Sequence, residues 1–311
     1  MKLGLGHSYD KVRFLNRKSR GYIDLTKPAS SVAVAVGYLL ASLFYYYYYG
    51  IESQILTDLN IILAVSLSIF LAHSASQSMN MAEDAEMDRE TPHKQNRPIP
   101  AGIVTEDEAR AVAWLGSGWA LSLAFVVSWQ FGIMVATLLF FGIFYNLDPI
   151  RAKERIISIP WQAASRGLLS FPAVWVAYGD IWAWEPWVLG VFMFFYVMGF
   201  QNSADIIDAP VDAEYGIRTF VVEFGVNGTM RIAAMCTGAM LVVLGFSVTA
   251  GLVPEGFIWM LLIIPFCIVM LYYMWSRPYQ VSSLTGNHPS WLWFYIGVVL
   301  CVAIPLAVYA P

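Results

Sequence analysis

Asn80, Asp84 and Asp88 follow one another at intervals of four residues at the end of a long apolar segment. On a helix these positions lie along one face, and continuing that face backwards adds Gln77 and His73. A line of polar side chains that enters an apolar segment costs free energy. It therefore indicates a binding or catalytic site rather than packing.

A second acidic group repeats this pattern later in the chain. Asp205, Asp208 and Asp212 stand at positions i, i+3 and i+7, which again share one helical face. If the two faces converge, their carboxylates repel one another unless cations lie between them. Oxygen ligands at a water-accessible site favour Mg²⁺, which completes its coordination with water and substrate phosphate oxygens. The two groups predict a magnesium site for a phosphorylated or pyrophosphorylated substrate, although acids that only solvate two helix ends are the alternative.

Basic residues in two loops could stabilise the negative charge that develops on a departing diphosphate. The first loop contains Lys94 and Arg97, and the second runs from Tyr145 through Arg151 to Lys153. Such residues could also serve membrane insertion alone, because loops on the cytoplasmic side of membrane proteins are rich in lysine and arginine.

Arg166 lies in the middle of another apolar segment and has no acidic neighbour in the sequence. A charged side chain at such a depth rarely faces lipid, so we expect Arg166 to face a cavity and contact an anion. His73 is a further candidate substrate contact, although a histidine hydrogen-bonded between helices would explain it equally well.

The segments that carry these residues are long and apolar. Hydrophobic residues make up 58% of the 311 positions and charged residues 13%, whereas about 25% of a soluble domain is charged. A helix needs about 20 mostly apolar residues to span a bilayer. The expected fold class is therefore an all-α, polytopic membrane bundle of nine transmembrane helices, at approximately 31–50, 57–80, 108–128, 130–146, 157–178, 184–204, 229–251, 255–275 and 289–309.

Lysine and arginine are concentrated on one side of this arrangement. Seven precede the first span, whereas the connections near 50–57, 129–130, 179–185 and 251–256 contain none, which predicts a cytoplasmic N-terminus. We expect a cytoplasmic basic segment at 1–30, a single transmembrane domain at 31–311, and a site that faces the cytoplasm from the cell membrane. The tyrosine run 45–49, at the other side, is interpreted as an interfacial aromatic belt.

Charge and cysteine content exclude other classes. The net charge of −4 and the lack of any recognisable module argue against a nucleic-acid partner. Cys236, Cys267 and Cys301 each lie inside an apolar run and not at metal-ligand spacing. A disulfide framework or a thiolate metal site is therefore not expected.

Taken in order, these motifs resemble those of the UbiA-type intramembrane prenyltransferases, and they cover nearly the whole chain. Two departures are Met81, where the family often has aspartate, and Lys27 before a proline, where it commonly has arginine. The matching residues are Asn80-x3-Asp84-x3-Asp88, Arg97-Pro-Ile-Pro-Ala-Gly, Tyr145-x3-Pro149-x3-Lys153 and Asp205-x2-Asp208-x3-Asp212-x3-Gly216-Ile-Arg218-Thr219.

The resemblance implies a bundle around a central cavity that opens to lipid and is capped by the loops that carry the motifs. It implies that two Mg²⁺ ions bind an isoprenyl diphosphate, with Arg97, Tyr145 and Lys153 nearby. The residues expected to carry catalysis are Asp84, Asp208, Lys153 and Tyr145; the metal ligands are Asn80, Asp84, Asp88, Asp205, Asp208 and Asp212; and the substrate contacts are Asn80, Lys94, Arg97, Arg151, Arg166 and His73.

The activity that the resemblance implies is Mg²⁺-dependent transfer of an isoprenyl group from a polyprenyl diphosphate, such as geranylgeranyl diphosphate, to a lipophilic acceptor in the bilayer. Arg166 and the basic loops favour an anionic acceptor, geranylgeranylglyceryl phosphate, as in archaeal-type ether-lipid synthesis of the digeranylgeranylglyceryl phosphate synthase type. Aromatic, tetrapyrrole and carotenoid acceptors are alternatives. A membrane ion transporter is the alternative from another class, but it predicts polar motifs continuing to the outer side, where the loops lack clustered charges.

Overall fold

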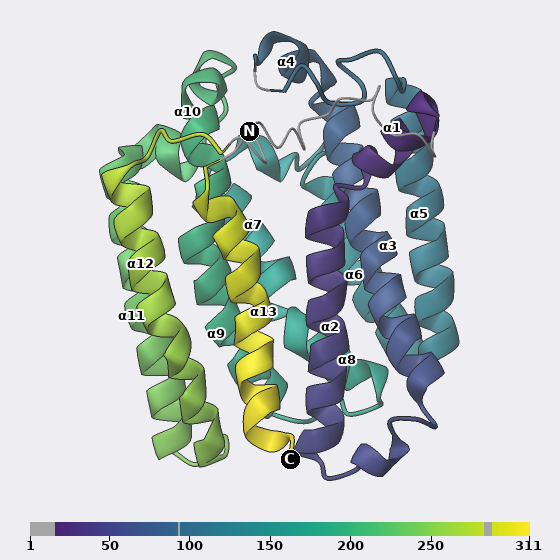
Figure 1. Ribbon diagram of the computed structural model, residues 1–311, viewed down its shortest axis with the longest axis vertical. Coiled ribbons are helices and arrows are strands. Elements are labelled where there is room, and N and C mark those ends of the chain that lie inside the picture. Colours follow the sequence, from purple (N-terminus) through teal and green to yellow (C-terminus); the bar gives the residue numbers. More distant parts are fainter. Residues whose placement is uncertain (1–15, 93, 283–287) are drawn as a thin grey trace.

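The computed structural model describes residues 16–311, apart from residue 93 and residues 283–287. Over these residues the chain is helical and has no strand. The long helices lie side by side in one bundle (Figure 1). The first half of the predicted basic segment 1–30 lies outside the described residues.

Seven helical segments in the described part of the chain are long and apolar enough to cross a membrane. This agrees with an all-α membrane bundle, whereas the count of nine spans and the side on which the N-terminus lies stay predictions. The segments are α2 (Pro28–Tyr48), α3 (Leu59–Glu83), α5 (Glu106–Val127), α9 to α10 (Glu185–Glu214), α11 (Phe220–Thr249), η6 to α12 (Glu255–Ser276) and α13 (Ser290–Tyr309).

Two predicted spans take a different form. The span expected at 130–146 is α6 (Trp129–Phe144), a shorter apolar helix of 16 residues. The segment expected as a span at 157–178 consists of α7 (Ser158–Gln162), a π-helical turn η4 (Ala163–Leu168) and α8 (Ser170–Ala177), and whether it crosses the membrane stays a prediction. Pro172 explains the break, because proline has no N–H and clashes with the carbonyl four residues earlier in a continuous α-helix.

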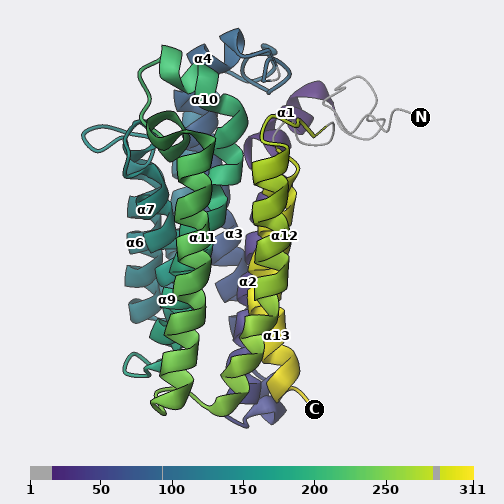
Figure 2. The same cartoon turned by 90° about the vertical axis from the view of Figure 1, so that its left-hand side faces the viewer.

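Short helices gather at one end of the bundle, which we call the motif end. There α4 follows α3, and α10 follows α9, in both views (Figures 1 and 2). The Tyr215 hydroxyl, just after α10, donates a hydrogen bond to Glu90 at the end of α4. The remaining short elements are α1 (Arg17–Leu25), η2 (Glu52–Gln54), α4 (Ala85–Glu90), η3 (Ala152–Glu154), η5 (Gln201–Ala204) and α10 (Asp205–Glu214).

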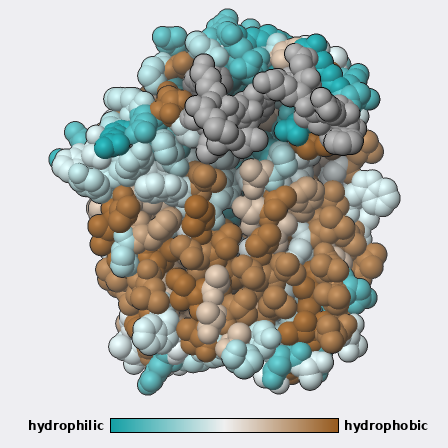
Figure 3. Space-filling model, viewed as in Figure 1, coloured by the Kyte–Doolittle hydropathy of each residue, from teal (hydrophilic) through white to brown (hydrophobic). Residues whose placement is uncertain are grey.

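The surface is divided in the way that a bilayer requires. On the face shown in Figure 3, hydrophilic residues lie at the motif end, and a broad hydrophobic band covers the helices below it. Large apolar side chains point outwards from this band, including Leu115 and Trp119 on α5 and Val242 and Phe246 on α11. Exposed apolar area of this extent is typical of a surface that contacts lipid rather than water.

The tyrosine run closes the opposite end of the bundle. Tyr46 is 2% exposed, and its hydroxyl donates to Asp58 Oδ2 at 2.8 Å. The Tyr48 hydroxyl donates to Glu185 Oε1 at 2.9 Å. The predicted interfacial aromatic belt is therefore wrong for Tyr46, because its ring is buried and its hydroxyl donates to the carboxylate of Asp58.

Candidate active site

The two acidic motifs meet at a cavity of about 370 Å³ at the motif end. The first motif comes from the end of α3, and the second lies on α10, which follows the 3-10 turn η5. The convergence of these two segments brings together five of the six carboxylate and amide side chains expected to hold metal. Those that line the cavity are Asn80, Asp84, Asp205, Asp208 and Asp212.

Asp88, the sixth expected ligand, does not line this cavity. The single helical face expected for the first motif is wrong because α3 ends at Glu83 and Asp84 has a non-helical backbone (φ −97°, ψ 0°). The Asp88 side chain is instead fully buried, and Arg97 Nη1 donates to its Oδ2 at 2.6 Å. Its other oxygen has no hydrogen bond and lies 4.0 Å from Lys94 Nζ.

Ammonium groups neutralise two of the aspartates that do line the cavity. Lys94 Nζ donates to Asp208 Oδ2 at 2.8 Å, and Lys153 Nζ donates to Asp84 Oδ1. Burial acts to raise the pKa of Asp84, but the charge of Lys153 and its hydrogen bond hold that pKa below its usual range. Asp84 is therefore a carboxylate at neutral pH, which is the form that binds a metal.

Asn80 connects the first acidic motif to Lys27, which was not predicted to be a site residue. Its amide nitrogen donates to Asp84 Oδ2 at 2.8 Å and to Asn146 Oδ1 at 3.1 Å, and its oxygen accepts from Lys27 Nζ at 3.0 Å. Burial and the positive charge of Arg97 lower the pKa of Lys27 to about 7. The signal that could have found Lys27 is its place directly before a proline at the start of α2.

The residues at this cavity fit Mg²⁺. The side chains of Asp205 and Asp212 line it, and within the described residues neither carboxylate has a side-chain hydrogen bond or a salt bridge, although the charge of Lys94 acts on both. The described residues contain no group of three or more His, Cys, Asp or Glu close enough to hold an ion, and Asp84 and Asp208 are each paired with a lysine. Mg²⁺ needs no such cage, since it is usually held by one or two carboxylates with water and phosphate oxygens.

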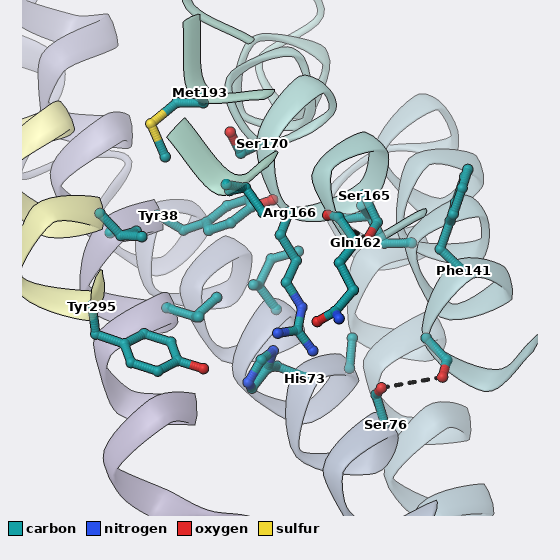
Figure 4. A pocket seen from close by; sticks show the side chains of 18 of the residues that line it. Tyr38, His73, Ser76, Phe141, Gln162, Ser165, Arg166, Ser170, Met193 and Tyr295 are labelled. Atoms are coloured by element: carbon teal, nitrogen blue, oxygen red, sulfur yellow. Dashed lines mark hydrogen bonds between the residues drawn. The ribbon is translucent and has the colours of Figure 1, made fainter. Parts of the chain in front are cut away.

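A second cavity, of about 110 Å³, lies next to the first and is mostly apolar. Arg166 and His73 line it, and Figure 4 shows both side chains directed to the same region beside Gln162. Gln162 Nε2 donates to the Tyr145 hydroxyl at 3.0 Å, and the His73 ring lies 3.3 Å from Gln77 Nε2. The residues that line both cavities are Ser76, Tyr145, Gln162, Arg166 and Tyr295.

Most of the expected substrate contacts line one of these cavities, and one does not. Lys94, Arg97 and Lys153 line the first cavity together with the acids. Arg151 lines neither; its Nε donates to Glu154 Oε1 at 2.5 Å within the turn η3. The structure thus places Arg151 in a local ion pair rather than at the site.

Comparison with known proteins agrees with this geometry. The 4-hydroxybenzoate octaprenyltransferase of Vibrio cholerae is 24% identical over 270 residues, which cover 83% of this chain and 88% of that protein. The protoheme IX farnesyltransferase of Archaeoglobus fulgidus is 31% identical over 130 residues. That match covers 42% of each chain, so the similarity spans less than half the length of that relative.

A solved structure of a UbiA homolog from Archaeoglobus fulgidus, bound to DMAPP and Mg²⁺, has the same fold. The TM-score is 0.73 at 18% identity, and the alignment covers 93% of this chain and 99% of that one. The model of the UbiA prenyltransferase family matches residues 38–284. Together with the seven apolar segments, this match indicates an integral membrane protein. The chain belongs to the UbiA prenyltransferase family.

Proposed function

We propose that this protein transfers an isoprenyl group from a polyprenyl diphosphate, such as geranylgeranyl diphosphate, to a lipophilic acceptor in the bilayer, with two Mg²⁺ ions as cofactor. The observation that carries the proposal is the pairing of two cavities: carboxylates and ammonium groups line the first, and mostly apolar and aromatic side chains line the second. A polyprenyl diphosphate has a charged head group, which matches the first cavity, and a hydrocarbon chain, which matches the second.

The acidic residues of the first cavity bind the metal in this proposal. Asn80, Asp84, Asp205, Asp208 and Asp212 supply the oxygen ligands, and Asp88 orients Arg97 through their ion pair. Mg²⁺, when bound, withdraws electron density from the diphosphate and so weakens its bond to the allylic carbon. The Mg²⁺ and DMAPP named for the Archaeoglobus fulgidus homolog support this assignment.

The basic residues and Tyr145 stabilise the leaving diphosphate. Lys94, Arg97 and Lys153 line the same cavity as the acids, and fixed cations of this kind are most effective in a site that excludes water. Tyr145 lies at the boundary between the cavities, where its hydroxyl can donate to the departing oxygen. The main chemical task of these residues is to hold positive charge and a hydrogen-bond donor where negative charge develops on the leaving diphosphate.

The second cavity protects the reactive carbon. Its aromatic walls, among them Phe141, Trp161 and Tyr295, present ring faces that stabilise positive charge on an allylic group. Its apolar lining also keeps out water, which would otherwise capture that carbon.

The acceptor that we favour is geranylgeranylglyceryl phosphate. Its support is Arg166, which lines both cavities and has no ion pair among the described residues, because a free guanidinium there suits a phosphate-bearing lipid. The named relatives act on protoheme IX and 4-hydroxybenzoate, so tetrapyrrole and aromatic acceptors are compared directly in the test below. The motif end is proposed to face the cytoplasm, because the loops at that end carry the basic residues.

Removal of metal tests the proposal. Purified protein in detergent is supplied with geranylgeranyl diphosphate and each acceptor in turn, and released diphosphate is measured. We expect EDTA to abolish release and added Mg²⁺ to restore it, since the carboxylates of the first cavity have no other means of binding the donor. Release that continues unchanged in EDTA would contradict the metal assignment.

A further inference from the structure

Arg166 is held in the interior by an unusual stretch of backbone. It lies in the π-helical turn η4, where the Leu169 N–H donates to the Ala164 carbonyl at 3.1 Å. π-Turns occur mostly as interruptions of α-helices and frequently at functional sites. The turn also packs tightly on α9, because an added Cβ on Gly167 would come within 2.6 Å of Phe194 Cα. The packing of this turn therefore fixes the position of the Arg166 Cα atom.

The surroundings of the guanidinium are polar but uncharged. Figure 4 shows its end directed towards His73 and Gln162, at the wall that the two cavities share. Tyr145 and Tyr295 complete this part of the wall. Within the described part of the chain Arg166 has no ion pair and no hydrogen bond, whereas Lys94, Arg97 and Lys153 each bind an aspartate.

Arg166 is only partly exposed, and an unpaired guanidinium in an apolar segment lowers stability, because a charge that loses contact with water needs a partner. An arginine at this position is explained if a bound ligand supplies the anionic group that pairs with it. The diphosphate has its own cations in the first cavity, next to the metal ligands. The second substrate must reach the same reacting carbon, and Arg166 lies where the two cavities meet because it lines both.

We propose that Arg166, with Gln162 and His73 beside it, forms a subsite for the anionic group of the acceptor, a carboxylate or a phosphate. The inference rests on the proposed prenyl transfer and narrows its acceptor. Acceptors that carry an anion, such as a glyceryl phosphate lipid, an aromatic acid or a tetrapyrrole with carboxylates, fit the subsite. An uncharged carotenoid does not.

Direct binding tests the subsite independently of catalysis. Geranylgeranylglyceryl phosphate and 4-hydroxybenzoate are titrated separately into detergent-purified protein without Mg²⁺. We expect one of them to bind, which distinguishes phosphate from carboxylate, and Arg166→Gln to weaken that binding about 10- to 100-fold. Arg166→Lys keeps the charge and should restore part of the affinity. Arg231→Gln, which removes an exposed arginine on α11, is the matched control and should leave binding unchanged.

Thermal unfolding separates this role from a structural one. Removing an unpaired, partly buried charge should leave the melting temperature of Arg166→Gln unchanged or raise it, whereas the loss of a structural arginine would lower that temperature. Binding of both anions by Arg166→Gln as tightly as by the wild type would overturn the proposal. So would a variant that loses affinity for geranylgeranyl diphosphate but not for the acceptor. Arg166-dependent anion binding by a protein that forms no prenylated product would sustain the subsite and reject the proposed transfer.

Discussion

Replacing Asp84 with asparagine is expected to reduce prenyl transfer by about 10²- to 10³-fold, the scale of loss when one group that stabilises a transition state is removed. The amide keeps the size of the side chain but loses the charge that pairs with Lys153 and that we propose binds Mg²⁺. Asp208→Asn, which changes the other motif, should have a similar effect. Turnover is measured as diphosphate released in the presence of Mg²⁺.

The control for this prediction is the neighbouring acid Glu83. Its carboxylate pairs with Arg110 at 2.8 Å, and it does not line the cavity, so Glu83→Gln should retain most of the turnover. Circular dichroism and thermal unfolding establish whether the aspartate variants are folded. Near-normal turnover in both folded aspartate variants would reject the assignment of the metal site.

Gly190→Ala is expected to destabilise the protein strongly and to impair the site. An added Cβ at Gly190 would lie 2.2 Å from the Leu168 carbonyl oxygen, which is backbone and cannot rotate away. Overpacking of this kind costs about 1–3 kcal/mol and occasionally more. The methyl group would push η4 away from α9, and η4 carries Arg166. We expect a melting temperature lower by several degrees and weaker acceptor binding.

Gly238→Ala is the matched control for this glycine. Gly238 lies within α11, where an added Cβ would meet nothing within 4 Å, and alanine has a higher helix propensity than glycine. Its melting temperature should be unchanged or slightly raised. Equal stability of the two variants would show that α9 and η4 do not pack as tightly as the structure indicates.

The sequence was sufficient to predict the membrane class and the convergence of the two acidic motifs, because long apolar runs and charges at helical spacing are local signals. It was not sufficient to locate the breaks in the helices. The helix α3 ends at Glu83, and Asp88, beyond that end, pairs with Arg97 and does not line the cavity. The π-turn at Arg166 likewise depends on packing against α9, which no local pattern encodes.

Contacts between distant segments account for the other differences. Lys27 reaches Asn80 across 53 residues of sequence, so its place in the site could not be read from either segment alone. Arg151 and Lys153 are only two residues apart, and yet one pairs with Glu154 and the other with Asp84. Which basic residue of a loop reaches a cavity is decided by the local backbone, here by the turn η3.

The measurement that tests the central claim most directly is the mass of the product. Purified protein is incubated with geranylgeranyl diphosphate, Mg²⁺ and geranylgeranylglyceryl phosphate, and parallel reactions contain an aromatic acid, a tetrapyrrole and a carotenoid. We predict that one anionic acceptor gains the mass of one geranylgeranyl group, only with Mg²⁺ and not with Asp84→Asn. Folded protein that prenylates no acceptor from donors of any chain length would contradict the account and favour ion transport.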